Sequence, residues 1–142
     1  MSAAGLSLRR ATFSFETAFL LVTLLAFGLR FAFLDLKLFH HDEAIHAWFS
    51  YQLLTRGAYT YDPSYHGPLL YYATAGMFSL FGDSDLTGRL IPALLGAALV
   101  PLVYAIYRLG YLDRTQTLVA ALFIAISPDL VYFSRFLRHD IF

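Results

Sequence analysis

The sequence predicts an all-α membrane protein with several spans, and two observations support this prediction. Hydrophobic residues make up 58% of the 142 residues and charged residues only 14%, whereas soluble domains average about 45–50% and about 25%. Long uncharged runs also recur along the chain, separated by short charged segments, as in helices that cross a bilayer. Because the chain stops directly after a charged cluster, we expect it to be the N-terminal part of a longer protein.

Composition also narrows the possible partners and sites. Ten basic and ten acidic residues cancel, and no run is rich in lysine or arginine, so a nucleic-acid partner is not expected. The chain has no cysteine, which excludes disulfides and thiolate metal ligands. The lipid bilayer is therefore the first expected partner.

Three apolar runs predict membrane-spanning helices, over about 13–34, 90–107 and 115–134. At about 1.5 Å per residue, each approaches the length needed to cross a hydrocarbon core of about 30 Å. The first run contains Arg30, which we expect to extend outward to the lipid headgroups. The third run is interrupted near its end by Pro128, a residue that breaks or kinks helices.

A fourth apolar run would give only about 21 Å of helix, which is too short to cross. Basic residues collect on the cytoplasmic side of membrane proteins, which favours a cytoplasmic position for Arg9, Arg10 and the loop 108–114. The arginine pair and this loop share a side only if two spans separate them, so residues of about 35–89 form an outer loop. The prediction is a multi-pass plasma-membrane protein with a cytoplasmic N-terminus. Its outer loop contains two helices at the membrane surface, over about 42–56 and 68–81.

Titratable side chains are concentrated directly after the first span. Asp42 and Glu43 follow His40 and His41, and His46 lies about one helical turn further on. Adjacent carboxylates near low-dielectric surroundings can have raised pKa values, so one can act as a base towards an acceptor hydroxyl while its neighbour binds a metal ion. We therefore consider Asp42 and Glu43 as catalytic residues and His41 and His46 as substrate ligands. The alternative is a helix N-terminus, with Asp42 as its cap and acidic residues favoured by the helix dipole.

A second charged cluster stands at the end of the chain. The third span returns outward, so Arg135, Arg138 and Asp140 are expected on the same side of the membrane as Asp42. The two arginines are three residues apart and share a helix face, which suits a phosphate-bearing ligand. Asp42 and Asp140 could share a divalent cation, Mg²⁺ or Mn²⁺, because these ions prefer carboxylate oxygens. The alternative is an ordinary charged span end that contacts lipid headgroups.

The segment before Gly67 is rich in tyrosine and in turn-forming residues. We consider Tyr65 and His66 as substrate-binding residues, because a histidine at the membrane surface can bind phosphate or shuttle a proton. The alternative for His66 is a hydrogen-bonded loop residue, and tyrosines at this level are typical interfacial anchors. Lys37 is interpreted as a flanking charge without a further role.

The order of these features resembles a known group of membrane enzymes. A first span is followed by Asp-Glu, by Gly-Pro-Leu-Leu-Tyr-Tyr at 67–72 and by Ser-Arg-x-x-Arg-x-Asp at 134–140. This order resembles the C-type-fold glycosyltransferases, which include protein O-mannosyltransferases, lipid A aminoarabinose transferases and the catalytic subunit of oligosaccharyltransferase. More narrowly, FHHDEAIHAW at 39–48 and YDPSYHGPLLYY at 61–72 are similar to the flippase-activity-associated glycosylation proteins of archaea and some bacteria. The resemblance covers nearly the whole chain from about Phe13.

The resemblance implies the N-terminal transmembrane module of a C-type glycosyltransferase with a helical extracytoplasmic first loop. It implies that Asp42 is a catalytic base or metal ligand, with Glu43 beside it, and that Asp140 is the second acidic site. The implied donor is a sugar on a polyprenyl or dolichyl phosphate, bound through Arg135 or Arg138 and transferred to an acceptor at the extracytoplasmic face. The alternative function is a non-catalytic component that binds lipid-linked sugars and assists their flipping. Proteins of a glycosylation pathway are implied partners.

Overall fold

The computed structural model describes residues 14–57 and 67–141, which form helices joined by loops, with no strand among them. The elements are α1 (Phe15–Phe31), α2 (His41–Arg56), α3 (Leu69–Phe81), α4 (Asp85–Arg108), α5 (Arg114–Ile126), α6 (Pro128–Ser134) and the short 3₁₀ helix η2 (His139–Ile141). The all-α prediction is therefore confirmed for the described residues.

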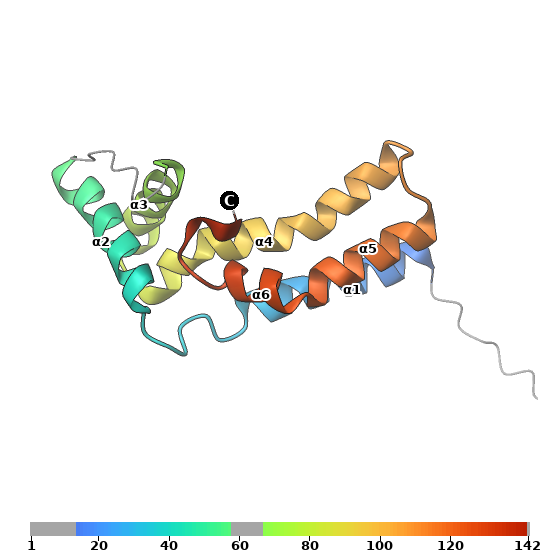
Figure 1. The fold of residues 1–142 in the computed structure, drawn as a ribbon, viewed down its shortest axis with the longest axis horizontal. Helices are drawn as coiled ribbons and strands as arrows, with labels where there is room; N and C mark the ends of the chain where they lie inside the picture. The colour runs from blue at the N-terminus through green and yellow to red at the C-terminus, as the bar shows by residue number, and fades with distance from the viewer. Residues whose placement is uncertain (1–13, 58–66, 142) are drawn as a thin grey trace, which may run out of the picture.

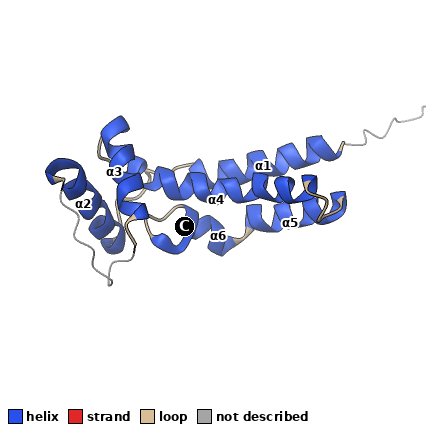
Figure 2. Cartoon of the chain, turned by 90° about the horizontal axis from the view of Figure 1, so that it is seen from above, coloured by secondary structure: helices blue, strands red, loops and turns tan. Residues whose placement is uncertain are grey.

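Four of the helices form an elongated bundle (Figure 1). α1, α4 and α5 pack against one another, and α6 follows α5 along α4. α2 and α3 pack side by side at one end of the bundle, where α3 contacts α4. η2 lies against α6 and α4, and Figure 2 shows the chain end between the α2–α3 pair and the bundle. The α1–α2 loop, the α2–α3 pair and the end of the chain therefore share one end of the molecule.

The bundle helices correspond to the three predicted spans. In the described part of the chain, α4 is the one helix long and apolar enough to cross a membrane by itself, and α5 with α6 forms a pair bent by 57° that passes the same criterion jointly. α1 has 17 residues, or about 26 Å, and α3 is a shorter apolar helix. α4 begins ahead of its predicted span because Ser84 and Thr87 form a capping box. By length and composition the structure thus offers one or two candidate spans.

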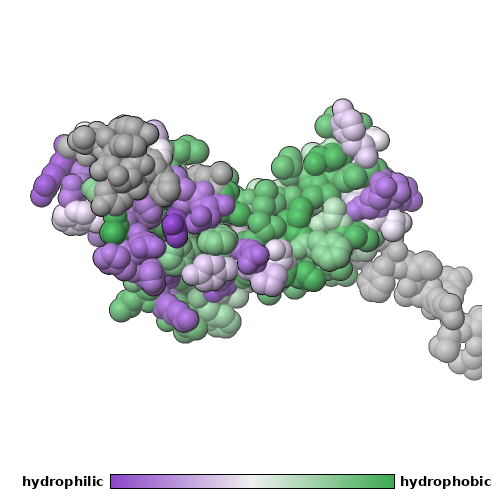
Figure 3. All heavy atoms as spheres, in the orientation of Figure 1, coloured by the Kyte–Doolittle hydropathy of each residue, from purple (hydrophilic) through white to green (hydrophobic). Residues whose placement is uncertain are grey.

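The surface of the molecule is divided into apolar and polar zones. Hydrophobic residues dominate the middle of the bundle in Figure 3, and hydrophilic residues gather over α2 and the chain end and again around the α4–α5 connection. Large apolar side chains that point outward from the bundle include Leu20, Leu24, Leu94, Leu102 and Phe123. An apolar belt between two polar zones is the surface that helices in a bilayer require.

α2 matches its predicted range within one residue, but its cap differs from the expectation. His40 is the N-cap: its Nδ1 accepts a hydrogen bond from the N–H of Asp42 at 3.4 Å, and the side chain of Glu43 accepts one from the N–H of His40 at 3.0 Å. Gly57 ends the helix with a φ of 62°, in the left-handed region that glycine adopts without strain. The alternative in which Asp42 serves as the cap is wrong, so capping does not consume its carboxylate.

The expectation for Arg30 is also wrong, because its side chain points into the bundle and is fully buried. The guanidinium donates to the carbonyl oxygens of Ile124 at 3.0 Å and Ala125 at 3.2 Å, and to the hydroxyl of Ser134 at 3.2 Å. In a continuous helix the carbonyl of Ile124 would accept from the residue four positions on, but that residue is Pro128, which has no N–H. Arg30 supplies the donors that the break between α5 and α6 removes.

Gly96 of α4 allows α6 to approach closely at this break. A Cβ at Gly96 would collide with the side chain of Ser134 and lie 3.1 Å from Nε of Arg30. Overpacking of this kind typically costs about 1–3 kcal/mol, so Gly96→Ala should lower the thermal unfolding midpoint of the full-length protein in detergent. Gly28→Ala in α1 is the matched control, because nothing lies within 4 Å of its Cβ position and alanine is the better helix former. Equal midpoints for the two variants would contradict this packing.

Candidate functional site

A buried ion pair between Glu43 of α2 and Arg89 of α4 lies at the polar end of the bundle. Nε of Arg89 donates to Oε1 of Glu43 and Nη2 donates to Oε2, both at 2.7 Å, and the Arg89 and Glu43 side chains are 6% and 2% exposed. The other donors of Arg89 reach the carbonyl oxygens of Leu34 (2.7 Å), Lys37 (2.7 Å) and Leu38 (3.2 Å). Because a bidentate pair is directional, it fixes α2, α4 and the α1–α2 loop relative to one another.

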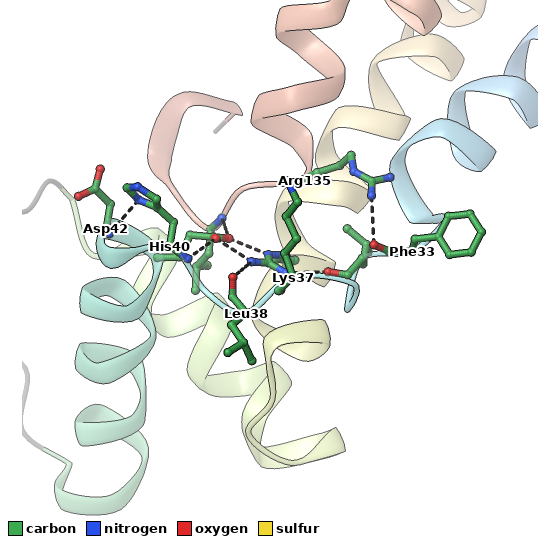
Figure 4. Close-up of polar contacts among 10 residues, drawn as sticks. Phe33, Lys37, Leu38, His40, Asp42 and Arg135 are labelled. Atoms are coloured by element: carbon green, nitrogen blue, oxygen red, sulfur yellow. Dashed lines mark hydrogen bonds and ion pairs between the residues drawn. The ribbon is translucent and has the colours of Figure 1, made fainter.

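Glu43 also binds two backbone groups. Its Oε2 accepts from the N–H of His40 at 3.0 Å, and its Oε1 accepts from the N–H of Leu137 at 2.9 Å. Leu137 is fully buried and lies between α6 and η2. Figure 4 shows this network around Leu38 and His40. One carboxylate therefore connects the first loop, α2, α4 and the end of the chain.

The environment of Glu43 keeps this carboxylate ionised. Burial by itself raises its pKa, but the hydrogen bonds from Arg89 and from the N–H groups of Leu137 and His40, together with the positive charge of Arg89, outweigh burial and hold the pKa below its usual value. Both oxygens are occupied by donors. Glu43 is thus placed to stabilise the fold and poorly placed to accept a proton from an incoming acceptor.

An exposed charged cluster, formed by Asp42, Arg138 and Asp140, lies beside the buried pair. Nη1 of Arg138 is 3.7 Å from Oδ2 of Asp42, and Nε of Arg138 is 3.4 Å from Oδ2 of Asp140. The side chains of Arg138, Asp42 and Asp140 are 40%, 43% and 37% exposed. Exposed pairs of this kind add little stability, so the cluster is available for binding or chemistry. The structure brings together one residue of α2 and two residues of the chain end.

As arranged, this cluster does not fit a divalent ion. The guanidinium of Arg138 contacts both carboxylates and so supplies the positive charge that a shared cation would bring. Within residues 14–57 and 67–141, no three His, Asp or Glu side chains are grouped to hold a metal, and Mg²⁺ and Mn²⁺ need several oxygen ligands. Mg²⁺ or Mn²⁺ at Asp42 and Asp140 stays a prediction, and it would require Arg138 to move aside.

Next to the exposed cluster, two histidines and a tyrosine pack together: His46, His139 and Tyr71. His46 is buried, and its Nδ1 lies 3.0 Å from the hydroxyl oxygen of Tyr71. The ring of His139 lies 5.5 Å from that of His46 and 5.8 Å from that of Tyr71, and its Nε2 donates to the carbonyl of Gly67 at 3.0 Å. These contacts seat η2 on α2 and α3, which fixes the backbone that carries Asp140.

Arg135 does not join Arg138. Its guanidinium instead donates to three carbonyl oxygens at the end of α1, those of Leu29 (2.8 Å), Ala32 (2.7 Å) and Phe33 (3.2 Å). Arg135 thus caps α1, and the two arginines that the sequence placed on one helix face point to different surroundings because α6 ends at Ser134.

Other residues named from the sequence are not gathered in this cluster. His41 is exposed in the first turn of α2, and Tyr65 and His66 lie outside the described residues. Sequence reasoning missed Arg89 and Tyr71. Arg89 directly precedes the apolar run 90–107, and an arginine at the start of such a run needs a partner. Nothing in the sequence distinguished Tyr71 from an interfacial tyrosine.

Comparison with known proteins adds an independent observation. Residues 65–142, more than half of the chain, match the family described as Dolichyl-phosphate-mannose-protein mannosyltransferase. The chain belongs to this family. Dolichyl-phosphate-mannose-protein mannosyltransferases are membrane glycosyltransferases, and the matched region contains Arg89, Arg138 and Asp140, whereas Asp42 and Glu43 precede it. No curated protein and no solved structure matches the chain.

Breaking the buried pair should destabilise the protein. Glu43→Gln leaves Arg89 buried without a counter-charge, which typically costs about 3–5 kcal/mol. The pKa of Glu43 is lowered from 4.5 in the folded protein, so its contribution is complete above pH 4.5 and is lost as the pH falls through the lower folded value. The unfolding midpoint of Glu43→Gln should therefore lie below that of wild type at neutral pH and approach it on acidification. Asp42→Asn is the control, and an equal loss with Asp42→Asn would contradict the assignment.

Proposed function

We propose that this chain is part of a glycosyltransferase that transfers a sugar from a polyprenyl- or dolichyl-phosphate donor to an acceptor at the extracytoplasmic membrane face. The exposed cluster of Asp42, Arg138 and Asp140 supports this function most directly, because it joins a carboxylate from α2 to the chain end. Membership of a family of membrane glycosyltransferases supports the same class of reaction.

Asp42 is the proposed general base. Its side chain is 43% exposed, whereas both oxygens of Glu43 are occupied by buried donors. During transfer the acceptor oxygen bonds to C1 of the sugar, the bond between C1 and the phosphate oxygen breaks, and the lipid phosphate leaves with the electron pair. The acceptor proton passes to the carboxylate of Asp42. Attack from the face opposite the phosphate makes the reaction inverting.

Arg138 and Asp140 complete the proposed site. Arg138 contacts the carboxylate of Asp42, and Asp140 contacts the other side of the guanidinium. Negative charge develops on the departing phosphate, so the positive charge of Arg138 beside Asp42 would stabilise the transition state. Arg135 is proposed as a further substrate contact on a separate surface, because its guanidinium binds the end of α1. Further substrate contacts are proposed at His41, His46, Tyr65 and His66.

Within the family, we propose a relationship to the flippase-activity-associated glycosylation proteins. The motif FHHDEAIHAW at 39–48 supports it, because this stretch contains Asp42, the buried Glu43 and the cap His40. Such a protein would work with other proteins of a glycosylation pathway.

Asp42→Asn in the full-length protein should lower sugar transfer by about 10²–10⁴-fold, because an amide cannot accept the acceptor proton. Transfer is measured in proteoliposomes that contain a polyprenyl-phosphate sugar labelled in the sugar. Asp35→Asn removes another exposed carboxylate from the α1–α2 loop and should keep activity.

Scoring transfer and flipping separately distinguishes the two functions. Undiminished transfer by Asp42→Asn would remove its role as base. Flipping without any transfer by the wild-type protein would favour the non-catalytic component that binds lipid-linked sugars.

We further propose that α1, α4 and the bent α5–α6 pair are three crossings, with the N-terminus in the cytoplasm. The α4–α5 connection lies at the opposite end of the bundle from α2 and α3 (Figure 1), which supports this arrangement. Cysteines introduced as Asp83→Cys and Tyr111→Cys should be labelled by an impermeant reagent from the outside and from the cytoplasm, respectively. The 142 residues contain no natural cysteine, so within them only the introduced thiol can be labelled. Labelling of Asp83→Cys from the cytoplasmic side would overturn the topology.

A further inference from the structure

Asp129, in the first turn of α6, is a charged residue that the proposed chemistry does not use. α6 packs against α4, α5 and α1, yet Asp129 is exposed. Within residues 14–57 and 67–141 its carboxylate forms no ion pair. The charge of Asp129 is therefore not balanced by this part of the chain.

The packing of α6 on α4 gives the depth of Asp129 in the bundle. Gly96 is near the midpoint of α4, about 17 Å from either end of that helix, and a Cβ at Gly96 would collide with the side chain of Ser134. Asp129 precedes Ser134 by five residues of the same helix, or about 8 Å along its axis. Whichever way α6 is tilted, Asp129 thus lies in the middle part of the bundle and not at a polar end.

The surface around Asp129 is apolar. Ile126 and Tyr132, three residues to either side, are 48% and 58% exposed, and Phe123 is 69% exposed. Hydrophobic residues dominate this middle zone of the bundle in Figure 3. Because α4 and the α5–α6 pair are proposed to cross the membrane, this surface lies at the depth of the hydrocarbon core.

A carboxylate at this depth requires a partner. A charge exposed to hydrocarbon is strongly unfavourable, and ionisable residues of membrane helices are almost always paired or face the interior of a bundle. Arg30, whose Nε lies 3.1 Å from the Cβ position of Gly96, follows this rule, since it is buried and its donors are bound. The dipole of α6 favours an acidic first turn, but a helix of seven residues offsets only part of the cost for Asp129.

The described helices do not supply the missing positive charge. Arg30 and Arg135 are the arginines next to this region, and both guanidinium groups donate to backbone carbonyl oxygens. A second copy of α1–α6 would bring the same engaged side chains. Lipid chains offer neither a positive charge nor a hydrogen-bond donor.

We propose that the outward face of α6 is a docking surface for a further membrane-embedded helix, which carries an arginine or a lysine opposite Asp129. Charge complementarity identifies this occupant, and Ile126 and Tyr132 supply the apolar part of the contact. The inference rests on the proposed crossings of α4 and the α5–α6 pair, and it is independent of sugar transfer.

Substitutions of Asp129 separate a paired carboxylate from one that faces lipid. The full-length protein, with any subunit that co-purifies, is placed in phosphatidylcholine nanodiscs, and its thermal unfolding midpoint is measured. Asp129→Leu and Asp129→Asn should each lower the midpoint by about 5 °C, because the basic partner is left buried without a counter-charge. Asp129→Glu should keep most of the wild-type midpoint. A midpoint that Asp129→Leu leaves unchanged or raises overturns the proposal, because leucine suits a helix face that contacts lipid.

Asp35 provides the matched control. It is an exposed carboxylate of the α1–α2 loop, outside the apolar zone, so Asp35→Leu and Asp35→Asn should leave the midpoint unchanged. Equal losses at the two positions would overturn the assignment to Asp129.

Photo-cross-linking identifies the helix that docks on α6. p-Benzoylphenylalanine in place of Tyr132, an exposed aromatic residue of the same short helix, should cross-link in native membranes to an apolar helix that contains an arginine or a lysine. Mass spectrometry maps the product. Cross-links to lipid alone, or to a helix without a basic residue, overturn the proposal.

Exchange of the two charges tests the pairing itself. Asp129→Lys should lower the midpoint further than Asp129→Leu, because two positive charges then oppose each other. Changing the basic residue of the cross-linked helix to aspartate should recover most of that loss, and no recovery by the double variant overturns the pair. None of these measurements uses sugar transfer, and the cysteine labelling described above tests the crossings separately, so failure of the proposed function is distinguishable from failure of this surface.

Discussion

The buried pair of Glu43 and Arg89 is the interaction on which the polar end of this protein depends. Arg89 stands in the first turns of α4 and Glu43 in the first turn of α2, so the pair joins the bundle to the α2–α3 pair. Desolvation of two charges is costly unless every donor and acceptor finds a partner. Here the backbone of the α1–α2 loop and the N–H of Leu137 meet that requirement. The ion pair consequently fixes four segments of the chain at once.

The buried ion pair also positions the exposed cluster, because the two clusters contain neighbouring residues of the chain. Asp42 precedes Glu43 and Arg138 follows Leu137, so the hydrogen bond between Glu43 and Leu137 brings their neighbours to the same surface. An exposed contact of 3.7 Å between Arg138 and Asp42 would not hold two distant segments together in water. The buried carboxylate of Glu43 stabilises the fold, and the exposed carboxylate of Asp42 remains available for chemistry. Adjacent acidic residues thus have different roles because their environments differ.

Within the bundle, the buried side chain of Arg30 has a structural role like that of Glu43. Pro128 breaks the third predicted span, and the carbonyl groups released by the break are bound by Arg30 from α1. Beyond the break, α6 ends at Ser134, so the next residue, Arg135, turns towards α1 while Arg138 lies further on, beside Asp42. Small residues at the crossing, above all Gly96, permit this approach. A local feature of one helix therefore determines which surface each arginine serves.

Sequence by itself determined the helices and their approximate bounds, because hydropathy and capping are local properties. The apolar runs, the helix over about 42–56 and the break at Pro128 were all readable in this way. Only the tertiary structure decided which charges are buried. Glu43 and Asp42 are equivalent in sequence, and the inward turn of Arg30 and the pairing of Arg89 depend on segments far away in the chain. A charge takes its role from its partners and its access to water, and folding alone brings those together.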